Sequence, residues 1–344
     1  MIGRTMNSRR ALPRVGLLLL LLAPVAGQAQ DGNDEFRGRH MPYDAFDRLA
    51  ITHVMVGASD FSVGFAPGKL DLSQAAVVEW IAASAGVVAA YYGRFPVARV
   101  RVLIVPADGN RVSSGMAFAF RGAALRVVLG RAATPDTLAR DWILIHELTH
   151  LAFPDVPRAQ HWIEEGLASY IEPVARAQVG KLSADDVWRQ FIDGMPKGLP
   201  AAGDRGLDFT PTWGRTYWGG ALFCLLADVE IRERTDNRFG LQDAVRAIVA
   251  SGGSMEVEWP LLRALDLGDK AVGVPVLVDL YERMKAAPVD VDLPQLWRRL
   301  GVAVTGDSVV FDDGAPLASV RRAITRRPGA AAPDGAATKG AGGV

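Results

Sequence analysis

The apolar and polar positions before residue 135 predict one long helix followed by a small sheet. Residues 72–92 are rich in alanine and valine, and Asp71 or Ser73 can cap the first turn of a helix there. Short apolar runs bounded by turn residues then predict strands. These strands are expected at 100–105, 116–120 and 125–129, with a turn at Arg121-Gly122 joining the last two.

Helical spacing dominates the chain from residue 134 onward. Thr134 can cap a helix whose first residue is Pro135, and this helix is predicted to run to Ala152, before Pro154. After a proline-containing loop at 153–160, a second helix is predicted at 162–171, ended by Pro173. Further helices are predicted at 184–193, 217–235, 241–250, 256–266 and 275–286. Strands followed by helices indicate an α+β fold, with a small mixed sheet preceding a mainly helical lobe.

The first 29 residues have the pattern of a secretory signal peptide. Arginines at positions 4, 9, 10 and 14 precede an apolar run at 15–22 and a stretch of small residues at 23–29, with cleavage expected near Ala29. The apolar run is shorter than the roughly 20 residues that span a bilayer. The sequence therefore predicts an exported, periplasmic or extracellular protein without a stable membrane anchor after cleavage.

The remaining chain is predicted to hold one domain. With 344 residues and 49% apolar content, the chain can bury a sizeable core. The domain is expected at 41–326, with a sheet lobe and active-site helix at 41–152 and a helical lobe at 153–326. A polar, mobile segment is expected at 30–40, and a Gly-, Ala- and Pro-rich disordered tail at 327–344.

Charge and cysteine content exclude several classes of function. The 38 basic residues balance the 38 acidic ones, and no basic stripe appears, so nucleic acid is not an expected partner. Cys224 is the single cysteine, so no disulfide can form within the chain. Because leucines and a phenylalanine surround it, Cys224 is interpreted as a buried apolar residue rather than a nucleophile.

The segment with the clearest chemistry is His146-Glu147-Leu148-Thr149-His150. Side chains four residues apart share a helix face, so His146 and His150 can bind one metal ion while Glu147 polarises a water molecule. A catalytic zinc ion needs a third protein ligand. A glutamate of the next helix, Glu164 or Glu165, can supply it if the two helices are antiparallel.

The segment Trp162-Ile163-Glu164-Glu165-Gly166-Leu167-Ala168 carries a family resemblance. With the histidine motif, it resembles the gluzincin metallopeptidases, the superfamily of thermolysin and of the M1 and M61 aminopeptidases. The resemblance implies a thermolysin-like domain, one Zn²⁺ ion and Glu165 as third ligand, with Glu164 as the alternative. His161 competes as a ligand but is interpreted as a surface or outer-shell residue. Ser169 or Glu172 could orient a ligating histidine.

A second segment, which starts at Tyr217-Trp218-Gly219-Gly220-Ala221, is similar to a stretch of the M61 and M1 peptidases. That similarity implies that Tyr217 donates a hydrogen bond to the oxyanion of the reaction. Arg215 could bind a substrate carboxylate, although a surface ion pair is the favoured interpretation. No equivalent appears of the M1 Gly-Ala-Met-Glu-Asn segment, so aminopeptidase activity does not follow. The strand at 115–120 could instead pair with an extended peptide.

These features predict an exported zinc metallopeptidase that hydrolyses peptide or protein substrates, with Glu147 as the general base. Two alternatives stay open. One is a zinc hydrolase of a non-peptide or cell-wall amide, and the other is a non-catalytic binding protein on the same fold. The sequence does not fix the natural substrate, endo- or exo-cleavage, or the oligomeric state.

Overall fold

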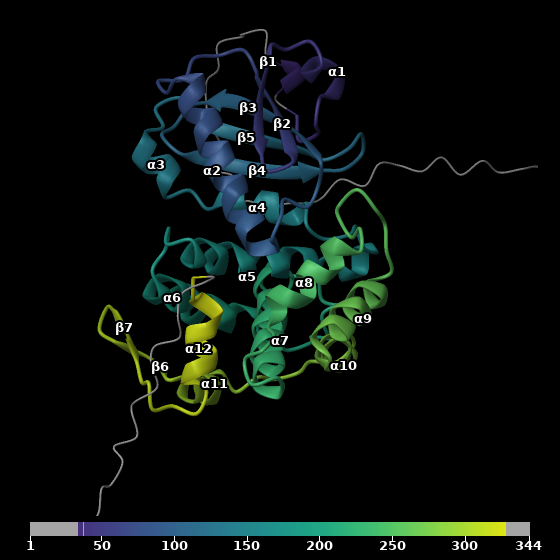
Figure 1. Ribbon diagram of the computed structural model, residues 1–344, viewed down its shortest axis with the longest axis vertical. Coiled ribbons are helices and arrows are strands. Elements are labelled where there is room, and N and C mark those ends of the chain that lie inside the picture. The colour runs from purple at the N-terminus through teal and green to yellow at the C-terminus, as the bar shows by residue number, and fades with distance from the viewer. Residues whose placement is uncertain (1–33, 37, 328–344) are drawn as a thin grey trace, which may run out of the picture. The chain divides into compact units, whose positions relative to one another are not determined.

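The computed structural model describes residues 34–36 and 38–327, which fall into two compact units (Figure 1). Unit 1 comprises the described residues before Arg94, apart from Ala90–Gly93, together with Arg94–Val156 and Ser251–Trp259. Unit 2 comprises Ala90–Gly93, Pro157–Ala250 and the described residues from Pro260 onward. The predicted signal peptide and all but the first residue of the predicted tail lie outside the described residues, so both stay predictions.

Unit 1 is built on a five-stranded mixed sheet. In sheet order the strands are β1 (Ile51–Val56), β2 (Ser59–Phe65), β3 (Arg99–Ala107), β5 (Ala124–Gly130) and β4 (Val112–Phe118). β3 is parallel to both of its neighbours, whereas β1 and β4 pair antiparallel at the two edges. The three predicted strands are confirmed. β1 and β2 were not predicted. β1 has no fully buried side chain, so it lacks the alternation of buried and exposed positions that predicts a strand.

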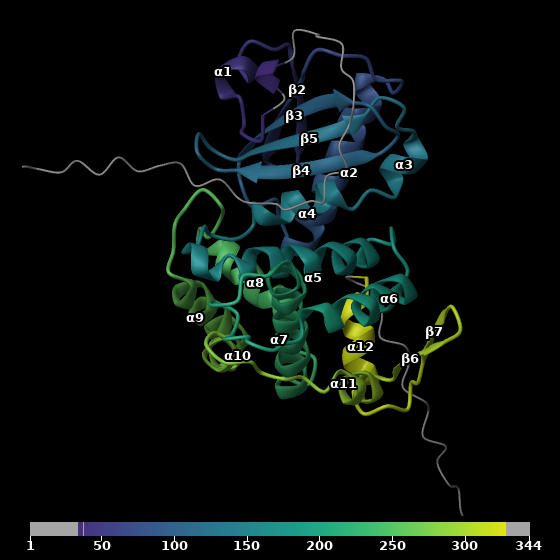
Figure 2. The same ribbon diagram turned by 180° about the vertical axis from the view of Figure 1, so that it is seen from behind.

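The core of unit 1 lies on both faces of β3. This strand is buried along most of its length, which is typical of a central strand. α2 (Gln74–Tyr92), close to the predicted helix, runs across one face (Figures 1 and 2). By length and composition alone, this helix could cross a membrane. Half of that stretch is buried inside the structure, as is common for core helices.

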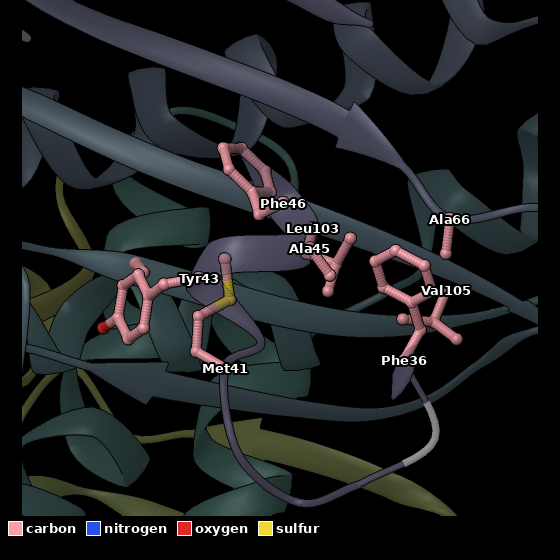
Figure 3. Packing of buried hydrophobic residues seen from close by; sticks show 9 residues of the cluster. Phe36, Met41, Tyr43, Ala45, Phe46, Ala66, Leu103 and Val105 are labelled. Carbon is pink, nitrogen blue, oxygen red and sulfur yellow. The ribbon is translucent and has the colours of Figure 1, made fainter. Parts of the chain in front are cut away.

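Apolar residues from the beginning of the described chain pack against Leu103 and Val105 of β3 (Figure 3). They come from η1 (Asp34–Phe36), α1 (Tyr43–Phe46) and the chain between them. Phe36 is 2% exposed, and its carbonyl oxygen accepts a hydrogen bond from Arg126 Nη2 at 2.8 Å. Part of the segment predicted to be mobile is thus anchored in the core.

The helix predicted from residue 135 to Ala152 is in fact two helices. Thr134 caps α3 (Pro135–Ala139) as predicted, but the helix ends there and α4 (Ile143–His150) begins anew. The two carboxylate oxygens of Asp141 accept hydrogen bonds from the backbone N–H groups of Ile143 at 3.2 Å and Leu144 at 3.0 Å. A side chain that satisfies the first N–H groups of a helix favours a new start over continuation.

The predicted stop at Pro173 is also wrong, because α5 (Trp162–Gln178) continues through it. A proline inside a helix costs about 3 kcal/mol. Leu167, Ile171 and Val174 of this helix are almost fully buried. Each such side chain contributes about 1.5–3 kcal/mol, so packing within unit 2 offsets the lost hydrogen bond.

Unit 2 is otherwise helical, as predicted, with a short hairpin near its end. After η2 (Arg158–Gln160) and α5 come α6 (Ala184–Gly194), η3 (Met195–Gly198), η4 (Arg215–Gly219), α7 (Gly220–Arg234), α8 (Leu241–Ala250), α9 (Leu261–Val272), α10 (Val276–Met284), α11 (Leu293–Leu300), β6 (Val302–Thr305), β7 (Ser308–Phe311) and α12 (Ala318–Thr325).

The helix predicted at 256–266 begins later, at Leu261. The preceding residues are extended instead: Asp155 N donates to Val257 O at 2.9 Å, and Trp259 N donates to Asp155 O at 3.0 Å. These bonds hold the segment in unit 1, and Pro260 then precedes the first turn of α9.

Two glycines let α5 and α7 meet backbone to backbone. A Cβ added at Gly166 would lie 2.3 Å from the carbonyl carbon of Gly220, and one added at Gly220 would lie 2.2 Å from the carbonyl oxygen of Trp162. No larger residue fits at either position without movement of a helix. The contact fixes the start of α7 against the part of α5 that carries Glu165.

We expect Gly166→Ala to destabilise unit 2, because the added methyl group has no space. Overpacking of this kind costs about 1–3 kcal/mol, and thermal unfolding measures it. Gly86→Ala is the matched control, since Gly86 lies in helix α2 with open space around it. That control should gain roughly 0.5–1 kcal/mol from helix propensity. Equal melting temperatures for the two variants would contradict the contact.

Candidate metal centre and active site

α4 presents both motif histidines as the spacing predicts. The rings of His146 and His150 lie with their centroids 4.9 Å apart. His146 and Glu147 are buried, whereas His150 is partly exposed. Leu144, Ile145 and Leu148 are also buried, and they hold the short helix in unit 1.

The third member of the group comes from α5. The potential ligand atoms of His146, His150 and Glu165 all lie within 4.8 Å of one another. Among the described residues, this is the group of histidine, cysteine and carboxylate side chains that could hold a metal ion. Glu164 and His161 are not in it. The group consists of the same three residues that the family resemblance implied as ligands.

The donor set fits zinc. Two imidazole nitrogens and one carboxylate oxygen are a ligand combination of catalytic zinc sites, in which the fourth position is left for water or substrate. Glu165 is 5% exposed and His146 is 4% exposed, so both are withdrawn from competing solvent. A buried carboxylate is costly unless a positive charge accompanies it, and a divalent ion would supply part of that charge.

Glu147 lies against the edge strand β4 because that strand has a glycine at the contact. A Cβ added at Gly115 would lie 2.4 Å from Glu147 Cγ and 3.0 Å from Ile143 Cγ2. Gly115 therefore leaves the space that the Glu147 side chain occupies. The sequence alone could not predict this contact, because Gly115 and Glu147 are far apart in the chain.

His161 lies beside the third ligand. Its Nδ1 is 2.5 Å from Glu164 Oε2, and its Nε2 is 3.3 Å from Glu165 Oε1. Burial acts to lower the pKa of His161, but the hydrogen bonds and charges of the two glutamates outweigh it and raise the pKa to about 10. His161 is thus a direct neighbour of Glu165, and its outer-shell role stays a prediction.

The two other predicted orienting residues lie further along α5. Glu172 is buried and accepts a hydrogen bond from Arg176 Nη1 at 2.8 Å, whereas Ser169 is partly exposed. Orientation of a histidine by Ser169 or Glu172 stays a prediction.

Tyr217 lies in the single turn of π-helix η4, just before α7. Its side chain is partly exposed, and its ring stacks on Trp213 with centroids 5.9 Å apart and an angle of 28° between the rings. Sequence spacing predicted an ordinary helix from 217. π-turns occur frequently at functional sites, but they have no residue pattern that separates them from α-helix.

Arg215 does not form the surface ion pair that was expected. Its Nε lies 2.8 Å from Asp204 Oδ2, and the two side chains are only 4% and 1% exposed. The pair is buried. Cys224 is buried as predicted, and burial raises the pKa of its thiol well above the ordinary value, which suppresses the nucleophilic thiolate.

No protein-family model and no curated protein matches the chain in sequence. Solved structures do match. The aminopeptidase N family protein of Idiomarina loihiensis superposes with a TM-score of 0.56 at 15% identity, over 75% of this chain and 50% of that one. The chain thus shares its fold with about half of that protein. The predicted α+β fold class is thereby confirmed.

A second solved structure that matches the chain is an M1 zinc metallopeptidase of Deinococcus radiodurans. The TM-score is 0.47 at 17% identity, over 72% of this chain and 52% of that one. The chain thus spans about half the length of the structures that it matches.

Adjacent glutamates provide a direct test of the metal site. We expect Glu165→Gln to weaken zinc binding by more than about 100-fold, beyond the roughly 10–100-fold typical of outer-shell changes. Glu164→Gln should fall within or below that outer-shell range. Competition with a chromophoric chelator measures both affinities. A larger loss for Glu164→Gln would reverse the assignment of the third ligand.

Proposed function

We propose that this protein is an exported zinc-dependent metallopeptidase that cleaves peptide bonds. The observation that carries the proposal is the group of His146, His150 and Glu165, with ligand atoms within 4.8 Å of one another, on an aminopeptidase N fold. Glu147 is adjacent to the first ligand and buried. The predicted signal peptide supports a periplasmic or extracellular location.

When bound, a zinc ion supplies a Lewis acid that polarises the scissile carbonyl group and lowers the pKa of a water molecule. Glu147 acts as the general base, since its carboxylate can take a proton from the attacking water and return it to the leaving amine. Its burial and its contact with the backbone at Gly115 limit the positions that the carboxylate can take. A fixed base lowers the entropic cost of reaching the transition state.

The substrate is proposed to lie along β4. This strand pairs with β5 on one side and forms an edge of the five-stranded sheet. An extended peptide can add to such an edge through backbone hydrogen bonds, which bind any sequence. Gly115 is in this strand and also touches Glu147, so a peptide on the edge would run past the base.

Tyr217 is proposed to stabilise the oxyanion through its phenol hydroxyl. The Gly166–Gly220 contact ties the turn that carries Tyr217 to the helix that carries Glu165. Both residues are in unit 2, so this unit alone sets the separation between the third ligand and the phenol. A donor aimed at charge that develops only in the transition state accelerates the reaction.

We expect Glu147→Gln to abolish turnover while one zinc ion per chain is retained. The amide side chain cannot accept the water proton, and Glu147 is not among the ligands. A loss of at least about 100-fold in kcat follows from removal of a general base. Metal analysis and peptide hydrolysis are measured on the same sample, with Glu79→Gln, an exposed glutamate of α2, as the control. Substantial turnover by Glu147→Gln would contradict the mechanism.

The peptidase activity itself is tested by digestion of a peptide library whose members are blocked at both ends. Unblocked peptides are digested in parallel, and we expect hydrolysis that a chelator suppresses and zinc restores. Cuts inside the blocked peptides would indicate an endopeptidase. Cleavage of unblocked peptides alone would indicate an aminopeptidase. Cleavage of cell-wall amides alone, or tight peptide binding without cleavage, would favour one of the two alternative functions over peptidase activity.

A further inference from the structure

A buried ion pair lies two residues before Tyr217 and takes no part in the proposed chemistry. Arg215 and Asp204 are removed from water almost completely, with Nε and Oδ2 2.8 Å apart. Desolvation of two charges costs several kcal/mol per ion, so such a pair is weak evidence for stability alone. Its place in the fold indicates a different role.

The guanidinium group of Arg215 links three segments of unit 2. Besides the contact with Asp204, Nη1 donates a hydrogen bond to the carbonyl oxygen of Gly198, at the end of η3, at 2.5 Å. Asp204 in turn accepts a hydrogen bond from Gly206 N at 2.7 Å. The first residue of the π-turn is thereby tied to η3 and to the loop that follows η3.

The backbone of η4 also fits closely against η3. A Cβ added at Gly198 would lie 2.4 Å from the backbone nitrogen of Gly219, and one added at Gly214 would lie 2.3 Å from the carbonyl oxygen of Lys197. The Gly220 contact with α5 follows directly. The π-turn is therefore held at its first residue by Arg215 and at its end by backbone contacts, with Tyr217 in the middle.

We propose that Arg215, paired with Asp204, is a positioning residue that holds the π-turn in the geometry that presents the Tyr217 phenol. The proposal rests on the catalytic role proposed for Tyr217. A π-turn has one residue more than an α-turn, so relaxation to α-helix would rotate Tyr217 by roughly 100° about the helix axis. The hydrogen bond from Arg215 to Gly198 and the ion pair with Asp204 oppose that relaxation. A misplacement of about 1 Å can cost 100-fold in rate.

The test is a double-mutant cycle measured by kcat. Arg215→Met with Asp204→Leu removes both charges together, which buried pairs often tolerate without loss of stability. We expect this variant to lose about 10- to 100-fold in kcat, with KM changed less than about twofold and zinc content full. In a Tyr217→Phe background the same change should alter kcat by less than about twofold, because the phenol that it positions is already gone.

Two further variants keep the test decisive. Arg215→Lys serves if the charge-free variant fails to fold. It keeps a positive charge beside Asp204 but lacks the planar guanidinium group that also reaches Gly198, so kcat should fall in the same Tyr217-dependent manner. Arg232→Met breaks another buried pair, Arg232–Asp228, at 2.8 Å on α7. We expect this control to lower the melting temperature, and its effect on kcat should be independent of Tyr217.

Hydrogen exchange gives a readout that does not depend on turnover. Removal of the Arg215 bonds should raise amide exchange in 215–219 and leave the later turns of α7 unchanged. If the losses of kcat caused by the Arg215 and Tyr217 substitutions multiply fully, the positioning role of Arg215 is wrong. Unchanged amide exchange in η4 would contradict it as well, and neither result would affect the proposed function. Full activity of Tyr217→Phe would overturn both this role and the proposed catalytic role of Tyr217, and a wild-type protein without turnover would overturn the proposed function as well.

Discussion

Burial of charge at the motif is the constraint on which the site depends. Glu147 and Glu165 are almost completely withdrawn from water, and so is the imidazole of His146. Carboxylates in such surroundings are stable as anions only when positive charge and hydrogen-bond donors are near. Around Glu165, His161 supplies part of that charge, and the pKa of His161 is raised accordingly. A divalent ion held by the two histidines and Glu165 would supply the rest.

Glycines at two close contacts fix where the functional side chains lie. Gly115 allows the Glu147 side chain to lie against β4, and Gly166 with Gly220 allows α5 and α7 to touch. The first contact places the Glu147 side chain against backbone, and the second joins the backbones of two helices, so neither depends on another flexible side chain. A residue held in this way has little freedom to lose when substrate binds, which is the physical meaning of a preorganised site.

The site was more predictable from the sequence than the details of the fold. His146, Glu147 and His150 follow from a four-residue spacing, and local signals gave the Thr134 cap. The errors arose where tertiary packing overrides a local signal: Pro173 continues a helix because its neighbours are buried, and Asp141 starts a new helix within an apparently continuous one. The buried Arg215–Asp204 pair and the π-turn depend on contacts between distant segments, and no local pattern encodes them.

The central claim is that His146, His150 and Glu165 hold one zinc ion. Zinc K-edge X-ray absorption of the purified protein tests it most directly, because the spectrum reports the atoms bound to the metal. The account predicts one zinc per chain, four nitrogen or oxygen neighbours at about 2.0–2.2 Å, and an imidazole signature that corresponds to two histidines. A sulfur neighbour, a single imidazole, or an octahedral shell of oxygen atoms would contradict it.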